Sequence, residues 1–165
     1  MVYRALGVLF SRLRLCISFA EFHENAGKWS FELIQSKAYP AEANNTLIHH
    51  FIEENNLQYQ VALITVHAES TGILFSGPSI AAATGLPVIT DLSALDLELG
   101  GNGEFYSTTS KKLSISVENM TELNKTICVA FMGILRWREE YNFLSSVTGA
   151  SRSSIGGAVW LGQEA

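Results

Sequence analysis

The feature that most constrains the fold is an alternation of apolar and polar residues near the start of the chain. Between residues 12 and 22 apolar side chains take every second position, namely Leu13, Leu15, Ile17 and Phe19. This period of two predicts a strand with one buried face. An apolar run precedes it at residues 2–8, and the alternation resumes at residues 29–34 after turn-forming residues 23–28. Three antiparallel strands are therefore predicted to open the chain, with residues 9–15 forming strand and a tight turn.

Helical and apolar segments follow the opening strands. The apolar stripe within residues 41–57 predicts a helix that covers the sheet. The uninterrupted β-branched run at residues 61–66 predicts a strand buried on both faces. A short helix is predicted at residues 78–84, with Pro78 at its first turn and Gly85 at its end, followed by a strand at residues 87–90.

The second half of the chain is less regular. Residues 104–116 are rich in Ser, Thr and Lys, and predict a connector with a strand near residues 112–117 and a junction near residues 104–118. A helix is predicted at residues 119–142, with Asn119 and Glu122 as a capping box. Its centre is apolar on every side, so it must be sandwiched, and we expect the side away from the sheet to be packed under residues 155–161 or buried in a homodimer. A last short strand is predicted at residues 158–161. All of these elements are expected to form one domain over residues 1–165.

The predicted order of elements defines a fold class. Three antiparallel strands followed by alternating helices and parallel strands predict an α/β protein with a ribonuclease-H-like, mixed five-stranded sheet. That arrangement serves nucleases, integrases, sugar kinases and ATPases, so the fold does not choose the function. The first strand carries no carboxylate, which argues against two-metal nuclease chemistry.

Candidate site residues lie at the ends of the predicted parallel strands. His67 follows the strand at residues 61–66, where open α/β sheets place their ligands, although a structural histidine is the commoner case. The strand at residues 87–90 leads into an acidic segment with Asp91 and Asp96. A glycine-rich turn with Gly100, Gly101 and Gly103 comes next. A carboxylate beside bare backbone can present a base to a charged ligand, whereas the plain alternative is a flexible loop.

The composition of the chain limits the kinds of partner that it is expected to bind. The 165 residues carry a net charge of −5, which argues against a broad basic surface for nucleic acid. Cys16 and Cys128 match no metal or redox spacing and are expected to be buried, reduced thiols. Arg12 and Arg14 interrupt the apolar N-terminal run, so neither a signal peptide nor a membrane span is expected. The sequence thus predicts a cytoplasmic protein with neither membrane nor nucleic-acid partners.

Five blocks of sequence resemble the anhydro-N-acetylmuramic acid kinases of bacteria. They are VYRALGV, ISFAEFHENAGKWSFE, FIEENNLQYQVALI, IAAATGLPVITDLSALDLELGGNG and AFMGILRWREEYNFLSSVTGASRSSIGGAVWLG, and they cover well over half of the chain. The resemblance implies an actin-like ATPase fold and phosphoryl transfer from ATP in cell-wall recycling. By this resemblance Asp96 is the base, and His67, Gly100, Gly101 and Gly103 bind substrate.

The chain departs from that family at the residues that hold phosphate. A glycine-rich phosphate turn is replaced by residues 9–15, LFSRLRL, and most of the second lobe is missing. Since phosphoryl transfer depends on binding the phosphates, the expected function is a non-catalytic, engineered or recombined single-lobe derivative without a cofactor. The alternative is an ATP- and Mg²⁺-dependent anhydro-sugar kinase, or a sugar-binding protein, that uses Asp96.

Overall fold

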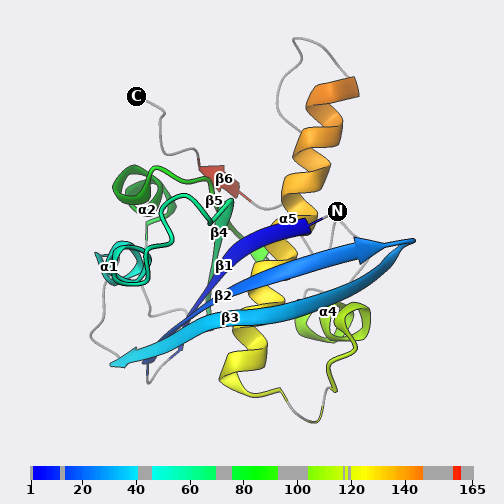
Figure 1. Ribbon diagram of the computed structural model, residues 1–165, viewed down its shortest axis with the longest axis horizontal. Coiled ribbons are helices and arrows are strands. Elements are labelled where there is room, and N and C mark those ends of the chain that lie inside the picture. The colour runs from blue at the N-terminus through cyan, green and yellow to red at the C-terminus, as the bar shows by residue number, and fades with distance from the viewer. Residues whose placement is uncertain are drawn as a thin grey trace.

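A single mixed sheet forms the centre of the molecule (Figure 1). The structure, a computed structural model, describes residues 2–11, 14–40, 46–69, 76–92, 104–116, 118, 120–146 and 158–160. Six strands follow the order β3-β2-β1-β4-β5-β6. Their bounds are β1 Val2–Phe10, β2 Arg14–Asn25, β3 Lys28–Pro40, β4 Leu63–Ala68, β5 Val88–Thr90 and β6 Ala158–Trp160.

The strand pairing confirms the predicted mixed sheet. Strands β1, β2 and β3 pair antiparallel, and β4 and β5 then add in parallel beside β1. The short strand predicted at residues 158–161 forms as β6, which pairs antiparallel with β5 and so adds a sixth strand to the predicted five-stranded sheet. Between β1 and β2, the Ser11 N–H donates to the Arg14 carbonyl at 2.9 Å, which confirms strand and a tight turn in place of a glycine loop.

The β2–β3 hairpin depends on two residues with positive φ. Ala26 has φ 54° and Gly27 has φ 80°, between strand ends Asn25 and Lys28. Two successive left-handed residues match the twist of the flanking strands in a two-residue hairpin loop. The hairpin therefore keeps β2 and β3 paired along their whole length.

Helices cover both faces of the sheet. Helices α1 (Thr46–Glu54) and α2 (Gly77–Thr84) pack on one face, where Ile48, Phe51 and Ile80 join a core with Leu6 and Phe19. Helices α4 (Phe105–Leu113) and α5 (Glu122–Ser146) cover the other face (Figure 1). Within the described part of the chain, no helix is long and apolar enough to cross a membrane.

Helix α4 corrects the expected connector. The polar composition of residues 104–116 suggested an irregular link with a strand, but residues 105–113 are helical. Phe105 and Leu113 are only 2% and 4% exposed, because they pack into the core on α5. Burial of these two apolar ends, rather than local propensity, stabilises the helix. Whether residues 104–118 also mark a junction stays a prediction.

Helix α5 is sandwiched, as its all-round apolar centre predicted. Val129 and Met132 are 0% and 1% exposed, since the sheet lies on one side of the helix and α4 on another. The expectation that this helix forms a homodimer interface is therefore wrong for residues 127–134, whose apolar surface is already covered within one chain. Thr121, not Asn119, caps the helix, because the Asn124 N–H donates to its Oγ1 at 3.2 Å.

Two glycines allow α5 to lie close to the sheet. A Cβ at Gly7 of β1 would stand 2.0 Å from the Thr126 carbonyl oxygen of α5. A Cβ at Gly133 of α5 would stand 1.6 Å from Oγ1 of Thr65 in β4. Helix and sheet are thus in contact where each presents bare backbone to the other.

Candidate functional site

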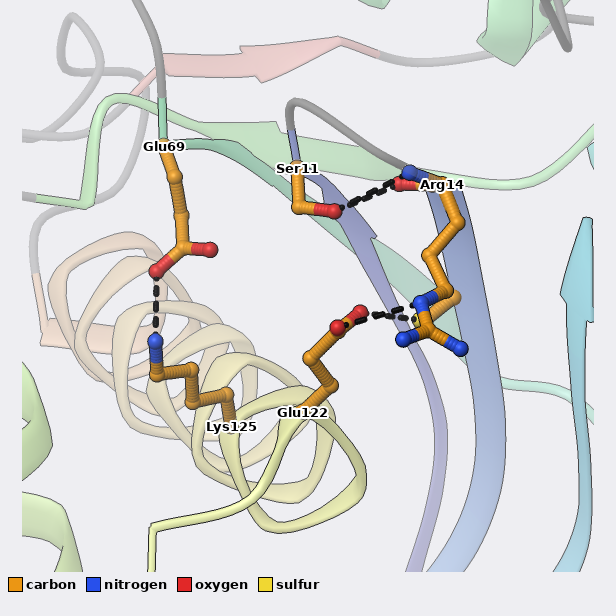
Figure 2. Close-up of polar contacts among 6 residues, drawn as sticks. Ser11, Arg14, Glu69, Glu122 and Lys125 are labelled. Atoms are coloured by element: carbon orange, nitrogen blue, oxygen red, sulfur yellow. Dashed lines mark hydrogen bonds and ion pairs between the residues drawn. The ribbon is translucent and has the colours of Figure 1, made fainter. Parts of the chain in front are cut away.

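The candidate site lies at the carboxyl ends of β1 and β4. From β1 the chain continues to β2 on one side, and from β4 it continues toward β5 on the other. Ligands of open α/β sheets bind at such a topological switch point. Ser11 follows β1, Glu69 follows β4, and α5 begins at the same edge (Figure 2).

One ion pair joins β2 to the first turn of α5. Arg14 Nε lies 3.1 Å from Oε1 of Glu122, and the two side chains are 50% and 33% exposed. The Cys16 thiol donates to Oε2 of the same carboxylate at 3.0 Å. Burial and then the Glu122 carboxylate raise the pKa of Cys16 to about 12, so this thiol is protonated and a poor nucleophile.

A second ion pair joins the end of β4 to α5. Lys125 Nζ lies 2.8 Å from Oε2 of Glu69, as Figure 2 shows, with 27% and 28% of the side chains exposed. The ammonium also lies 5.6 Å from the centre of the Tyr106 ring. Glu69 and Glu122 are therefore each neutralised by a cation.

His67 faces the aromatic residues of α4. Its ring meets Phe105 edge-on with centroids 4.9 Å apart, and Tyr106 with centroids 6.1 Å apart. Burial lowers the pKa of His67, and the nearby Glu69 carboxylate opposes that shift only in part. A neutral imidazole packed between aromatic rings serves the core more than it serves acid–base chemistry.

A groove opens beside the Arg14–Glu122 pair. It has a volume of about 380 Å³ and lies between β2, β3 and the start of α5. Its lining includes Arg14, Glu122 and the hydroxyl residues Ser18, Ser36 and Thr121, and Lys37 borders it from β3 while the Lys37 ammonium contacts Glu54 on the other face of the sheet. The groove thus combines one arginine, the carboxylate paired with it and three hydroxyl side chains.

The described acidic residues do not fit a two-metal centre. Within the described ranges, no group of three or more His, Cys, Asp or Glu side chains could hold a metal ion. Glu69 and Glu122 are each paired with a cation, and a divalent metal ion would have to displace Lys125 and Arg14 from them. We therefore derive no metal-dependent step from these residues.

Of the residues expected to form the site, the structure describes only His67. His67 does lie at the carboxyl end of β4, as predicted. Asp96, Gly100, Gly101 and Gly103 lie outside the described residues, so the site built on them stays a prediction.

Sequence reasoning missed the two ion pairs. The available signals were Glu69 two residues after His67, and Glu122, which was assigned to a helix cap alone. Arg14 was counted only as the polar side of a strand.

Comparison with solved structures places the fold in a class. The fold is ribonuclease-H-like: a structure of Thermus thermophilus RuvC matches with a TM-score of 0.56 and 12% identity, over 84% of this chain and 96% of RuvC. T. thermophilus RuvC in complex with a Holliday junction substrate matches with a TM-score of 0.47 and 11% identity, over 92% of this chain and 99% of that one. No family model and no curated protein matches the chain.

These similarities correct the resemblance to anhydro-N-acetylmuramic acid kinases. The solved structures are RuvC and not sugar kinases, so both the kinase-derivative function and the kinase alternative are wrong. The blocks that carried the resemblance include strand β1 and the centre of α5, whose apolar patterns serve the sheet and its covering helix.

Two expected absences are corrected as well. The expectation of no nucleic-acid partner is overturned together with the kinase resemblance, since the fold matches that of RuvC. That expectation used the net charge of the whole chain, which does not describe a local cation such as Arg14. The expectation of no cofactor rested on the resemblance to the kinases and is wrong with it. The missing phosphate-binding motifs argue against ATP alone and not against other cofactors.

Proposed function

We propose that this ribonuclease-H-like domain binds nucleic acid through the carboxyl edge of its sheet and the adjoining groove. The observation that carries the proposal is the half-exposed Arg14 guanidinium at the groove. Within the described part of the chain, its ion pair with Glu122 is made through Nε. A planar fork of N–H donors of this kind suits a phosphate.

Lys37 does not add its charge to the groove, because it pairs with Ile17 and its ammonium lies on the other face of the sheet, beside Glu54 of α1. Its Nζ lies 3.4 Å from Oε1 of Glu54, with 45% of the Lys37 side chain exposed, so the pair is weak and can rearrange. Lys125 stands at the edge but is tied to Glu69 at 2.8 Å. Arg14 and Lys125 can therefore contact about one or two phosphates, which agrees with a chain whose net charge is −5.

Reduced cysteines support a cytoplasmic location as part of the same proposal. Cys16 and Cys128 are both buried and free. Free buried thiols are the rule where cellular reductants keep cysteines reduced.

The proposal is tested by fluorescence anisotropy with three labelled DNA probes: a four-way junction, a duplex and a single strand. Binding should weaken with salt, with a slope of log K against log salt between about −1 and −2. Arg14→Ala should reduce affinity about tenfold and the slope by about one unit, because one charge-assisted phosphate contact is lost. Glu122→Gln should strengthen binding, since it removes a negative charge and releases Arg14.

Lys28→Ala is the matched control, because Lys28 stands at the opposite end of β3 from the groove. It should leave affinity unchanged. The proposal fails if no probe binds at low salt, or if Arg14→Ala and Lys28→Ala bind alike. The same mixtures, incubated with Mg²⁺ or Mn²⁺ and analysed on a denaturing gel, test separately for cleavage.

A further inference from the structure

Strand β3 is a long sheet edge whose outer side is unpaired. Its 13 residues pair with β2 on one side only, and no other described strand pairs with it. Most of its side chains are exposed, including 44% of the apolar Ile34. An edge of this length is a template for another strand unless the protein blocks it.

A β-bulge changes which side chains of β3 share a face. The register with β2 shifts so that Leu33 faces Ala20 and Gln35 faces Phe19, which leaves Ile34 as the extra residue. Glu32 faces Glu21, and Lys37 faces Ile17. Because residues 17, 19 and 21 of β2 point to one face, their partners Glu32, Gln35 and Lys37 also share a face.

This arrangement makes β3 complementary to itself. Consider two copies of β3 paired antiparallel about Gln35, with the bulged Ile34 left out of the pairing in each strand. Glu32 of each copy then faces Lys37 of the other. Leu33 then faces Ser36, and Phe31 faces Ala38, in each case on the face opposite to that of the charges. Without the bulge, residues five apart would point to opposite faces, and this pairing could not form.

The charges on the edge favour such a pairing. Within the described residues, Glu32 makes no ion pair with a cation, and its cross-strand neighbour is the Glu21 carboxylate. Glu21 is already bound by Arg4 at 2.8 Å and by His23. Lys37 contacts Glu54 at 3.4 Å and the Tyr39 ring at 5.0 Å, both at the surface, so it can exchange partners at little cost.

We propose that two copies of this chain associate through β3, joining their sheets into one continuous antiparallel sheet with two symmetry-related Glu32–Lys37 pairs. The two-fold axis passes through the Gln35 pair, and the exposed Ile34 side chains lie on either side of it. The interface is isologous, as closed homodimers require. It does not depend on nucleic-acid binding.

Sedimentation of the full chain over a range of concentrations tests this interface. The wild type should form a dimer. Glu32→Lys should weaken it by about tenfold or more, because it places like charges opposite each other at both symmetry-related positions. The double variant Glu32→Lys/Lys37→Glu exchanges the two charges and should restore the dissociation constant.

Glu53→Lys is the control, since it makes the same charge reversal at an exposed carboxylate of α1. It should not change the dissociation constant, and melting curves should show that every variant is folded. Amide exchange on β3 should also slow as protein concentration rises. A monomeric wild type, or a double variant as weak as Glu32→Lys alone, would overturn the proposal.

Discussion

The contact between β1 and α5 allows a sharp prediction for Gly7→Ala. The added methyl group would lie 2.0 Å from the Thr126 carbonyl oxygen and 3.0 Å from the Ala130 nitrogen. Contacts become ordinary only at 3.4 Å, so α5 would have to move by about 1.4 Å. Both obstacles are backbone atoms and cannot rotate away.

The loss of stability follows from the gap that this movement would open between α5 and the sheet. The helix residues Ile127, Phe131 and Ile134 are 2%, 0% and 0% exposed, and all of them pack into the core against the sheet. A radial gap of even ~0.5–1 Å forfeits a quarter to a half of the dispersion energy at each contact. We expect Gly7→Ala to lower the free energy of unfolding by at least about 3 kcal/mol, at or above the usual range for overpacking. Urea unfolding followed by circular dichroism measures the change.

Gly27→Ala provides the comparison. Gly27 has φ +80° and nothing within 4 Å of a Cβ, so alanine there meets only left-handed strain, worth about 1–2 kcal/mol. If Gly7→Ala costs no more than Gly27→Ala, α5 does not lie against β1 as described.

Gly133→Ala separates backbone from side-chain obstruction. Its new methyl group would meet Thr65 Oγ1 at 1.6 Å, and this hydroxyl makes no hydrogen bond within the described part of the chain. Adding Thr65→Ala should therefore recover part of the stability lost in Gly133→Ala. No side-chain substitution at Thr126 should rescue Gly7→Ala, because its obstacle is a main-chain oxygen.

Three further predictions concern titration and capping. The pKa of His67 is below its ordinary value in the folded state, so the unfolded chain binds more protons than the folded one. Stability should therefore fall as the pH drops below about 6.5. His67→Phe should flatten that part of the curve of melting temperature against pH. Cys16, with its pKa raised to about 12, should be alkylated at pH 8.5 at least ~100-fold more slowly in the folded protein than in urea, and Glu122→Gln should speed the folded reaction. Peptide mass mapping reads this out, and an equal rate in Glu122→Gln would contradict the role of the carboxylate. Thr121→Ala removes the cap of α5 and should cost about 1 kcal/mol by urea unfolding, whereas Thr121→Asn should retain most of it.

The strands were predictable because their signals are local. The alternation that begins at Leu13 and the β-branched run at residues 61–66 predicted strands, and β2 and β4 form there. The alternation predicted one buried face, which is wrong, because Cys16 and Ser18 of β2 are buried as well. The sandwiching of α5 followed from a centre that is apolar on every side. The mixed sheet, antiparallel first and parallel after, followed from the predicted order of the elements.

Helix α4 was not predictable in the same way. Its middle is Ser, Thr and Lys, and Phe105 and Leu113 become helix-stabilising only when α5 is there to receive them. The resemblance to a kinase misled for a related reason, since short matching blocks report the local patterns of strands and helices, which unrelated functions share.

The candidate site also has one part that local sequence predicts and another that depends on tertiary packing. The sequence by itself determined the strands and the position of His67 at the end of β4, since each depends on residues near one another in the chain. Only the tertiary structure brought Arg14 to Glu122 and Glu69 to Lys125, which are 108 and 56 residues apart. It also decided, through one bulged residue at Ile34, that Glu32 and Lys37 share a face. Charge pairs of this kind carry no periodic signal, because what positions them is the packing of α5 and the register of the sheet.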